Sequence, residues 1–166
     1  MNADERRWSK SRGITLLELL IVVAIILIIA AIAIPNLIKS KMAANEASAV
    51  GSVRTINTGE VNYAASCPAV GFSATLLELN TGALCPGGTG IIDNVLAAGT
   101  KSGYTFKYTP TKGGDNLNDT YISTGTASTL GTTGQRMFCS SQTGVIQYDV
   151  NGNACVTGPA GSPALQ

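Results

Sequence analysis

One acidic residue stands near the start of a long apolar run, and its chemistry needs an explanation. Residues 14–34 are nearly all Ile, Leu, Val and Ala, and Glu18 is the charged residue among them. An unpaired carboxylate in hydrocarbon is costly, because the charge loses its hydration without gaining a partner. The carboxylate of Glu18 therefore needs a compensating charge or hydrogen-bond donors.

Other residue types in the chain argue against catalysis. The sequence contains no histidine, which removes the usual general base and the commonest zinc ligand. No nucleophile stands in an evident arrangement with a base, so we predict no enzyme activity, no catalytic residue and no cofactor. The formal net charge of +1 gives no reason to expect a nucleic-acid partner.

The acidic stretch at residues 115–119 has a poor pattern for calcium. An alternating loop of oxygen ligands would carry Asp or Asn where Leu117 stands. We therefore predict a plain polar hairpin loop here, and no metal site in the chain.

The apolar run has the length of a membrane span. As a helix, residues 14–34 would extend roughly 32 Å, which is about one bilayer core. The preceding residues carry four basic side chains against two acidic ones, Asp4 and Glu5. Basic residues next to an apolar helix keep that end in the cytoplasm, so the remainder of the chain lies on the far side of the membrane.

Pro35 follows the apolar run, and its missing backbone donor bends or ends a helix. Helix-forming residues continue to about Ala65, with an apolar stripe near helical spacing. The stripe comprises Met42, Ala49, Val50, Val53, Ile56, Val61 and Ala64. The sequence therefore predicts one long kinked helix, whose second half packs one face against a C-terminal head and ends at Cys67-Pro68.

The head is rich in Gly, Thr, Ser and Asn and shows short helical and strand patterns. We predict helical turns at 73–80, where Thr75 and Glu78 have capping-box spacing, and at 91–99. Period-2 patterns and hairpin turns predict antiparallel strands at Tyr104–Thr109, Thr120–Thr124, Gln135–Ser140 and Val145–Val150. We predict that residues 123–133 form an exposed polar loop between strands. The fold class is α+β, a long N-terminal helix followed by a sheet of three or four strands.

The four cysteines, Cys67, Cys85, Cys139 and Cys155, all lie in the head. An even number outside the cytoplasm suggests two disulfides, and four cysteines allow three pairings. We favour 67–85 with 139–155, because each closes a short loop. The alternative is that some of the cysteines stay reduced.

The segment RGITLLELLIVVAIILIIAAIAIP, from Arg12 to Pro35, resembles the N-terminus of type IV pilins and of the pseudopilins of type II secretion. The resemblance is strong from residue 12 to about 40, and it rests on Gly13, Thr15, Glu18 and Pro35. It implies that a membrane prepilin peptidase cuts after Gly13 and methylates the new amine of Ile14. Most relatives have Phe where this chain has Ile14.

The resemblance also implies how the chain is divided. Residues 1–13 would be a leader that is removed, 14–35 the half of the helix in the membrane or the filament core, and 36–166 the head with the amphipathic half. The mature subunit would wait in the inner membrane, with the leader side cytoplasmic and the head extracytoplasmic.

Assembly machinery in the inner membrane would then extract the subunit into a helical filament of identical copies, an extracellular pilus. Glu18, with Thr15 beside it, would serve this assembly, because the carboxylate faces the Ile14 amine of a neighbouring subunit. Pro35 would mark a kink or a locally melted stretch.

Other interpretations of the N-terminus remain open. A secretory signal cleaved after Ala31-x-Ala33 would leave Ile34 as the first residue, whereas a plain membrane anchor would keep Met1. A pseudopilin would share the processing but form a secretion piston. A membrane-tethered enzyme is the alternative of another class.

Overall fold

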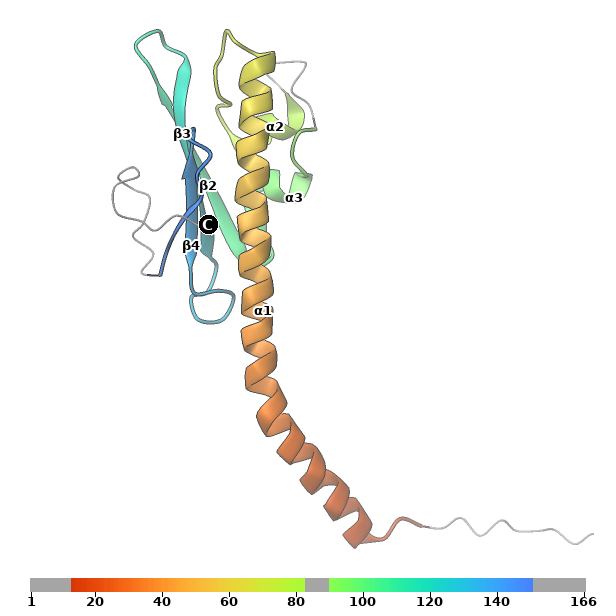
Figure 1. Ribbon diagram of the computed structural model, residues 1–166. Coiled ribbons are helices and arrows are strands. Elements are labelled where there is room, and N and C mark those ends of the chain that lie inside the picture. Colours follow the sequence, from red (N-terminus) through yellow and green to blue (C-terminus); the bar gives the residue numbers. More distant parts are fainter. Residues whose placement is uncertain (1–12, 83–89, 151–166) are drawn as a thin grey trace, which may run out of the picture. The chain divides into compact units, whose positions relative to one another are not determined.

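The computed structural model describes residues 13–82 and 90–150 of the chain (Figure 1). The chain divides into two units, Met1–Leu37 and Ile38–Gln166. The elements are α1 Leu16–Ser66, α2 Leu76–Thr81, α3 Asn94–Ala97, β1 Thr100–Lys101, β2 Tyr104–Lys112, β3 Asn118–Ala127, β4 Met137–Ser141 and β5 Gln147–Asp149. The α+β class predicted from the sequence is confirmed.

The first unit contains the apolar half of α1. An 18-residue window of this helix has a mean hydropathy of 3.3, and none of the window is buried inside the chain. By length and composition, α1 is able to cross a membrane. The helix continues through Pro35, as predicted, although the missing proline N–H leaves the carbonyl of Ala31 without its helical donor. A kink at Pro35 stays a prediction.

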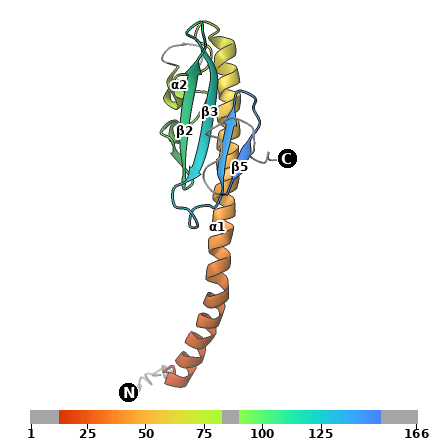
Figure 2. The same ribbon diagram turned by 90° about the vertical axis from the view of Figure 1, so that its left-hand side faces the viewer.

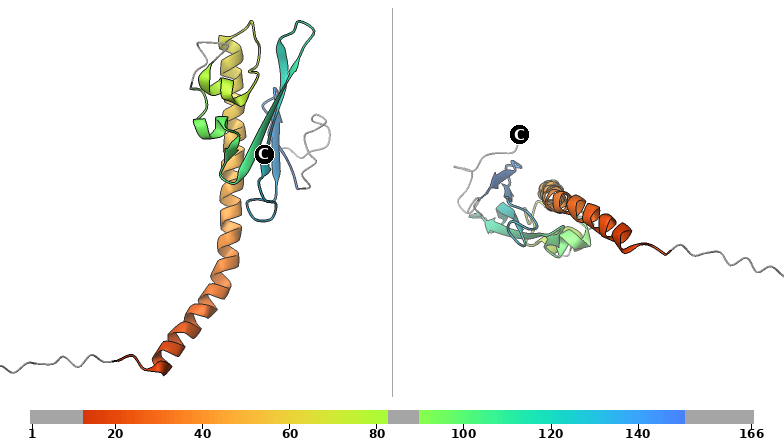
Figure 3. Two further views of the ribbon diagram at one scale, coloured as in Figure 1. Left: turned by 180° about the vertical axis from the view of Figure 1, so that it is seen from behind. Right: turned by 90° about the horizontal axis from the view of Figure 1, so that it is seen from below.

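The second unit joins the remainder of α1 to the sheet. Among the described residues, five strands form one antiparallel sheet in the order β1-β2-β3-β4-β5. The long strands β2 and β3 run beside this half of α1 (Figure 2). The short helices α2 and α3 also lie beside it, as the view from behind shows (Figure 3).

Apolar side chains of α1 and of the sheet build the core between them. Ala49, Val53, Ile56 and Tyr63 recur at steps of three, four and seven along one face of α1, and each is at most 1% exposed. They belong to one buried cluster with Leu79, Ile92, Leu96, Tyr104, Phe106 and Phe138. Burial of this face explains why α1 persists in a segment that contains Gly51 and Gly59.

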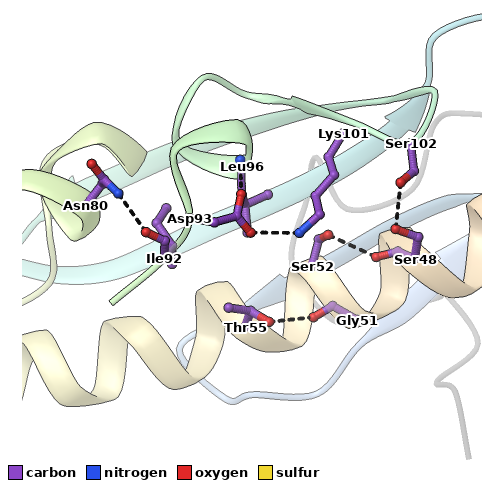
Figure 4. A network of polar contacts seen from close by, with 10 residues as sticks. All are labelled: Ser48, Gly51, Ser52, Thr55, Asn80, Ile92, Asp93, Leu96, Lys101 and Ser102. Carbon is purple, nitrogen blue, oxygen red and sulfur yellow. Dashed lines mark hydrogen bonds and ion pairs between the residues drawn. The ribbon is translucent and has the colours of Figure 1, made fainter. Parts of the chain in front are cut away.

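The sheet is longer than the sequence predicted. The prediction of three or four strands missed β1, because two residues are too few to show an alternating pattern. Ser102 and Gly103 both have positive φ, 50° and 72°, and form the tight turn that returns β1 to β2. The hydroxyl of Ser48 on α1 bonds that of Ser102 at 2.9 Å, which attaches this turn to the helix (Figure 4).

Two further predictions about the head were wrong. The exposed connection predicted at residues 123–133 is in part strand, because β3 extends to Ala127. Residues 123–125 pair with both β2 and β4, and Thr126 and Ala127 pair with β2. Thr is well accommodated in strands. Val61, placed in the buried stripe of the helix, is 61% exposed, whereas its neighbour Glu60 is fully buried.

The loop between β2 and β3 is a hairpin loop of polar residues. Asp115 accepts a hydrogen bond from the backbone N–H of Leu117 at 3.1 Å, which fixes the turn. Lys112 donates to the side chain of Asn116 at 3.2 Å. In the described ranges, no three His, Cys, Asp or Glu side chains come together as a metal site.

Cys67 and Cys139 are buried at the end of α1 and in β4, and neither is a free thiol. Cys85 and Cys155 lie outside the described residues. The pairing 67–85 with 139–155 therefore stays a prediction.

Ser123 on β3 is a fully buried residue whose hydroxyl oxygen has no hydrogen-bond partner among the described residues. An unsatisfied buried hydroxyl costs about 1–3 kcal/mol. We therefore expect Ser123→Ala to raise the free energy of unfolding by about 1 kcal/mol, measured by chemical denaturation of the full chain in detergent.

Ser140 provides the matched control for this substitution, because it pairs with Ser123 in the register of β3 and β4. Its hydroxyl accepts from Asn57 at 2.7 Å and donates to the carbonyl of Val145 at 2.9 Å. Ser140→Ala should destabilise the head. Equal losses in both variants would contradict the assignment of Ser123 as unsatisfied.

Candidate functional site

The start of α1 is closed by a reciprocal pair of hydrogen bonds between Thr15 and Glu18. The backbone N–H of Glu18 donates to Thr15 Oγ1 at 3.2 Å, and the backbone N–H of Thr15 donates to Glu18 Oε2 at 3.4 Å. The Thr15 hydroxyl also donates to the same carboxylate oxygen at 3.4 Å. This arrangement is a capping box, which satisfies two of the backbone donors that a helix leaves free at its N-terminus.

The carboxylate of Glu18 retains bonding capacity after it has capped its own helix. Both bonds from Thr15 end on Oε2, and Oε1 accepts no hydrogen bond from any described residue. The side chain is exposed and lies in the first turn of α1, where the helix dipole favours an anion. Glu18 thus caps its own helix through Oε2, and its Oε1 is available to a further hydrogen-bond donor.

The residues before the helix are accessible. Gly13, Ile14 and Thr15 have no helical assignment and are exposed, with Ile14 76% exposed. A Cβ added to Gly13 would meet no atom within 4 Å. Nothing inside the described chain therefore requires glycine at this position, so a requirement for it would have to come from a molecule that binds there.

The apolar half of α1 surrounds this site with unpartnered hydrophobic surface. Every large aliphatic side chain from Ile14 to Ile38 is 46–81% exposed. Contiguous apolar surface of this extent needs lipid or another protein to cover it. The site therefore combines an exposed segment at Gly13–Thr15, the carboxylate of Glu18 and the exposed apolar half of α1.

The capping box was not predicted from the sequence, although its signal was present. The same Thr-x-x-Glu spacing was used to predict the turn at Thr75–Glu78, where the structure has the predicted cap with Glu78 N–H donating to Thr75 Oγ1 at 3.3 Å. Because Glu18 stands in an apolar run, the sequence was interpreted in terms of a counter-charge for Glu18, and its spacing from Thr15 was not interpreted as a cap.

A second group of acids in the head was also missed by sequence reasoning. Glu60 Oε2 and Oε1 accept from the N–H and hydroxyl of Ser73 at 2.9 and 2.6 Å. Glu78 Oε1 accepts from Tyr63 at 2.6 Å, and its Oε2 accepts from the N–H of Ala74 at 2.7 Å. The bonds of Glu60 connect α1 to the segment that leads into α2, and the bond from Tyr63 to Glu78 connects α1 to α2 itself.

Burial raises the pKa of Glu60 above its ordinary 4.5, with a further contribution from the charge of Glu78, against the lowering effect of hydrogen bonds from Ser73 and Tyr108. Tyr63 faces the same acids, and burial together with its bond to Glu78 raises its pKa well above 10. Since both acids are almost inaccessible, at 0% and 4% exposure, we assign them to stability rather than binding.

Glu46 connects α1 to the residues that lead into β4. Its carboxylate pairs with Arg136 at 2.6 Å and accepts from the N–H of Gln135 at 2.8 Å. Burial raises the pKa of Glu46, but these hydrogen bonds and the guanidinium outweigh it, and the pKa lies below 4.5. Arg136 also lies over the rings of Phe138 and Tyr148, at 5.6 and 5.4 Å, so it is held from three sides.

Comparison with known proteins first defines the class to which the N-terminal segment belongs. Residues 8–34 match the family model described as the prokaryotic N-terminal methylation motif. This stretch contains the capping box and most of the exposed apolar helix. The predicted resemblance of this segment to type IV pilins is thereby confirmed.

A particular relative agrees with this class. The chain is 44% identical over 54 residues to the type IV major pilin protein PilA of Myxococcus xanthus (strain DK1622). The aligned stretch covers 32% of this chain and 24% of the relative, so the chain spans about a quarter of the relative's length. No solved structure matches the chain. The chain is thus pilin-like in the part that the comparison covers.

Proposed function

We propose that this protein is the structural subunit of a type IV pilus, which polymerises into a helical filament through the apolar half of α1. The observation that carries the proposal is the exposed apolar helix headed by a held carboxylate, within a segment that matches the methylation motif. A helix that is apolar all round has to be covered, first by lipid and then by copies of itself.

Processing would precede assembly. A prepilin peptidase cuts after Gly13, removes residues 1–13 and methylates the amine of Ile14. The exposure of Gly13 and Ile14, and the open space around Gly13, support access of such an enzyme to the bond. The mature subunit then waits in the inner membrane with its head outside the cytoplasm, and pilus assembly machinery extracts it into the extracellular filament.

Glu18 would pair with the Ile14 amine of a neighbouring subunit during assembly. Two unit charges about 4 Å apart attract by about 1 kcal/mol in water but by about 4 kcal/mol at an effective dielectric of 20. Oε1 accepts no hydrogen bond from the residues that the structure describes, which supports this use, since Oε1 can meet the amine while Oε2 keeps the helix capped. The pairing also fixes axial register, which apolar surfaces alone leave free to slide.

The proposal is tested by shearing filaments from cells that express the chain and analysing them by electron microscopy and mass spectrometry. We expect abundant fibres whose main subunit begins at methylated Ile14. A subunit that begins at Met1 or Ile34 would contradict the proposal, because it would indicate a plain anchor or a secretory signal. Processed protein that stays in the membrane fraction, without fibres, would point to a pseudopilin.

A further inference from the structure

We propose that Thr15 is a positioning residue for leader cleavage: its capping box fixes the start of α1 and so keeps the Gly13–Ile14 bond outside the helix. The inference rests on the proposed function, since it concerns how a prepilin peptidase reaches its substrate. It assigns to Thr15 a role before assembly, separate from any role in the filament.

The capping bonds define where the helix begins. Thr15 accepts the N–H of Glu18 with its hydroxyl and gives its own N–H to the Glu18 carboxylate. The first helical hydrogen bond runs from Leu19 N–H to the Thr15 carbonyl at 3.1 Å. Gly13 and Ile14 therefore lie ahead of the first turn, with their backbone outside the helical bonding.

Cleavage requires this open backbone. In hydrolysis, water gives its hydroxyl to the Gly13 carbonyl carbon and a proton to the Ile14 nitrogen as the amide bond between them breaks. Within a helix, the Gly13 carbonyl would accept from Leu17 N–H, and the turn would cover the bond. Peptide-binding enzymes and domains take extended segments, whose backbone groups are free to pair with the protein that binds them.

The membrane setting makes the cap necessary. Uncompensated backbone donors are costly near hydrocarbon, so an uncapped helix gains by extending into the preceding residues. Ile14 is apolar and would be taken into such an extension. The capping box removes this gain, because it satisfies the donors with side chains at Thr15 and Glu18.

Substitutions at Thr15 separate capping from recognition of side-chain shape. Val is closest to Thr in shape but has no oxygen to accept a hydrogen bond, whereas Ser and Asn differ in shape and are good N-caps. If a peptidase recognised the shape of Thr15, Thr15→Val would be the mildest change. If the cap positions the bond, Thr15→Ser and Thr15→Asn would be the mildest.

The experiment follows cleavage of the full-length precursor in membranes that contain a prepilin peptidase, by mass spectrometry over time. We expect Thr15→Val and Thr15→Ala to slow cleavage about fivefold, the worth of a typical N-cap, and Thr15→Ser and Thr15→Asn to stay within about twofold of the original rate. Thr75→Val removes the equivalent cap of α2 and is the control, which should leave the cleavage rate unchanged.

The inference is overturned if Thr15→Val is cleaved as fast as the original chain, or if Thr15→Ser and Thr15→Asn are as slow as Thr15→Val. Both results presuppose that the original chain is cut after Gly13. If the original chain is not cut there, the proposed function itself fails, and the inference fails with it.

Discussion

Cells that express Glu18→Gln should insert the subunit into the membrane but produce at least tenfold fewer filaments than cells with the original chain. Removal of one member of a buried charge pair costs about 2–5 kcal/mol, so each contact between subunits weakens by more than a factor of ten. Gln keeps the size of the side chain and can serve in a capping box, because its carbonyl accepts the Thr15 N–H. The substitution therefore removes the charge and retains the cap. Filament yield is measured by quantifying sheared fibres against the subunit content of the membrane.

Two control variants make this result specific. Glu18→Ala removes the charge together with the carboxylate half of the capping box, and it should lose filaments at least as severely as Glu18→Gln. Thr15→Ser preserves the cap and the charge, and it should retain filaments. If Glu18→Gln forms filaments normally while Glu18→Ala does not, Glu18 acts through the helix cap alone, and the proposed charge pairing between subunits is wrong.

Glu60→Ala should destabilise the head by about 3–6 kcal/mol, which is a large fraction of the stability of an ordinary domain. The substitution leaves the buried N–H of Ser73 without the acceptor it has in the original chain, leaves its hydroxyl with the carbonyl of Thr75 at 3.2 Å, and opens a cavity beneath the segment that leads into α2. Denaturant unfolding of the full chain in detergent, followed by tyrosine fluorescence or near-UV circular dichroism, measures the change. A loss below about 1 kcal/mol would show that Ser73 finds other partners.

Glu60→Gln is the matched variant, and it isolates the dependence of stability on pH. Because the pKa of Glu60 is raised in the folded state, the native chain binds this proton more tightly than the unfolded chain. The contribution of Glu60 to stability is therefore present below pH 4.5 and is lost as the pH rises through the folded pKa. Tyr63, Tyr108, Tyr121 and Glu78 are the other titratable groups that face it among the described residues.

The difference in stability between the original chain and Glu60→Gln should thus fall as the pH rises above 4.5 and level off above the folded pKa. Glu46 acts in the opposite direction, since its lowered pKa gives stability that is lost as the pH falls below 4.5. Glu46 is present in both proteins, so its contribution cancels in the stability difference between the original chain and Glu60→Gln. A difference that rises with pH would contradict the raised pKa of Glu60.

The parts of the fold predicted from the sequence are those with long, periodic or chemically distinctive patterns. The apolar run and the spacing of Ala49, Val53 and Ile56 predict α1, because burial on one face of a helix repeats with the helical period. Cys67-Pro68 ends the helix where predicted. The segment with Gly13, Ile14 and Glu18 resembles type IV pilins, and residues 8–34 match the prokaryotic N-terminal methylation motif.

The parts that were missed depend on contacts between residues far apart in the chain. Glu46 and Glu60 interrupt the apolar face of α1, and only the partners supplied by Arg136 and Ser73 make their burial tolerable. β1 is too short to show a pattern, and its pairing with β2 depends on the turn at Ser102. By contrast, the Thr15–Glu18 cap could have been predicted from the sequence, since the two residues have the Thr-x-x-Glu spacing of a capping box.

We propose that Glu18 is retained at the start of an apolar helix because a neighbouring subunit supplies the counter-ion of its carboxylate. A high-resolution electron cryomicroscopy map of filaments made from this chain tests it most directly. We expect a central bundle of apolar helices in which each Glu18 carboxylate lies within ion-pair distance of the Ile14 amine of an adjacent subunit. A bundle in which Glu18 faces solvent, or lies far from every amine, would contradict it.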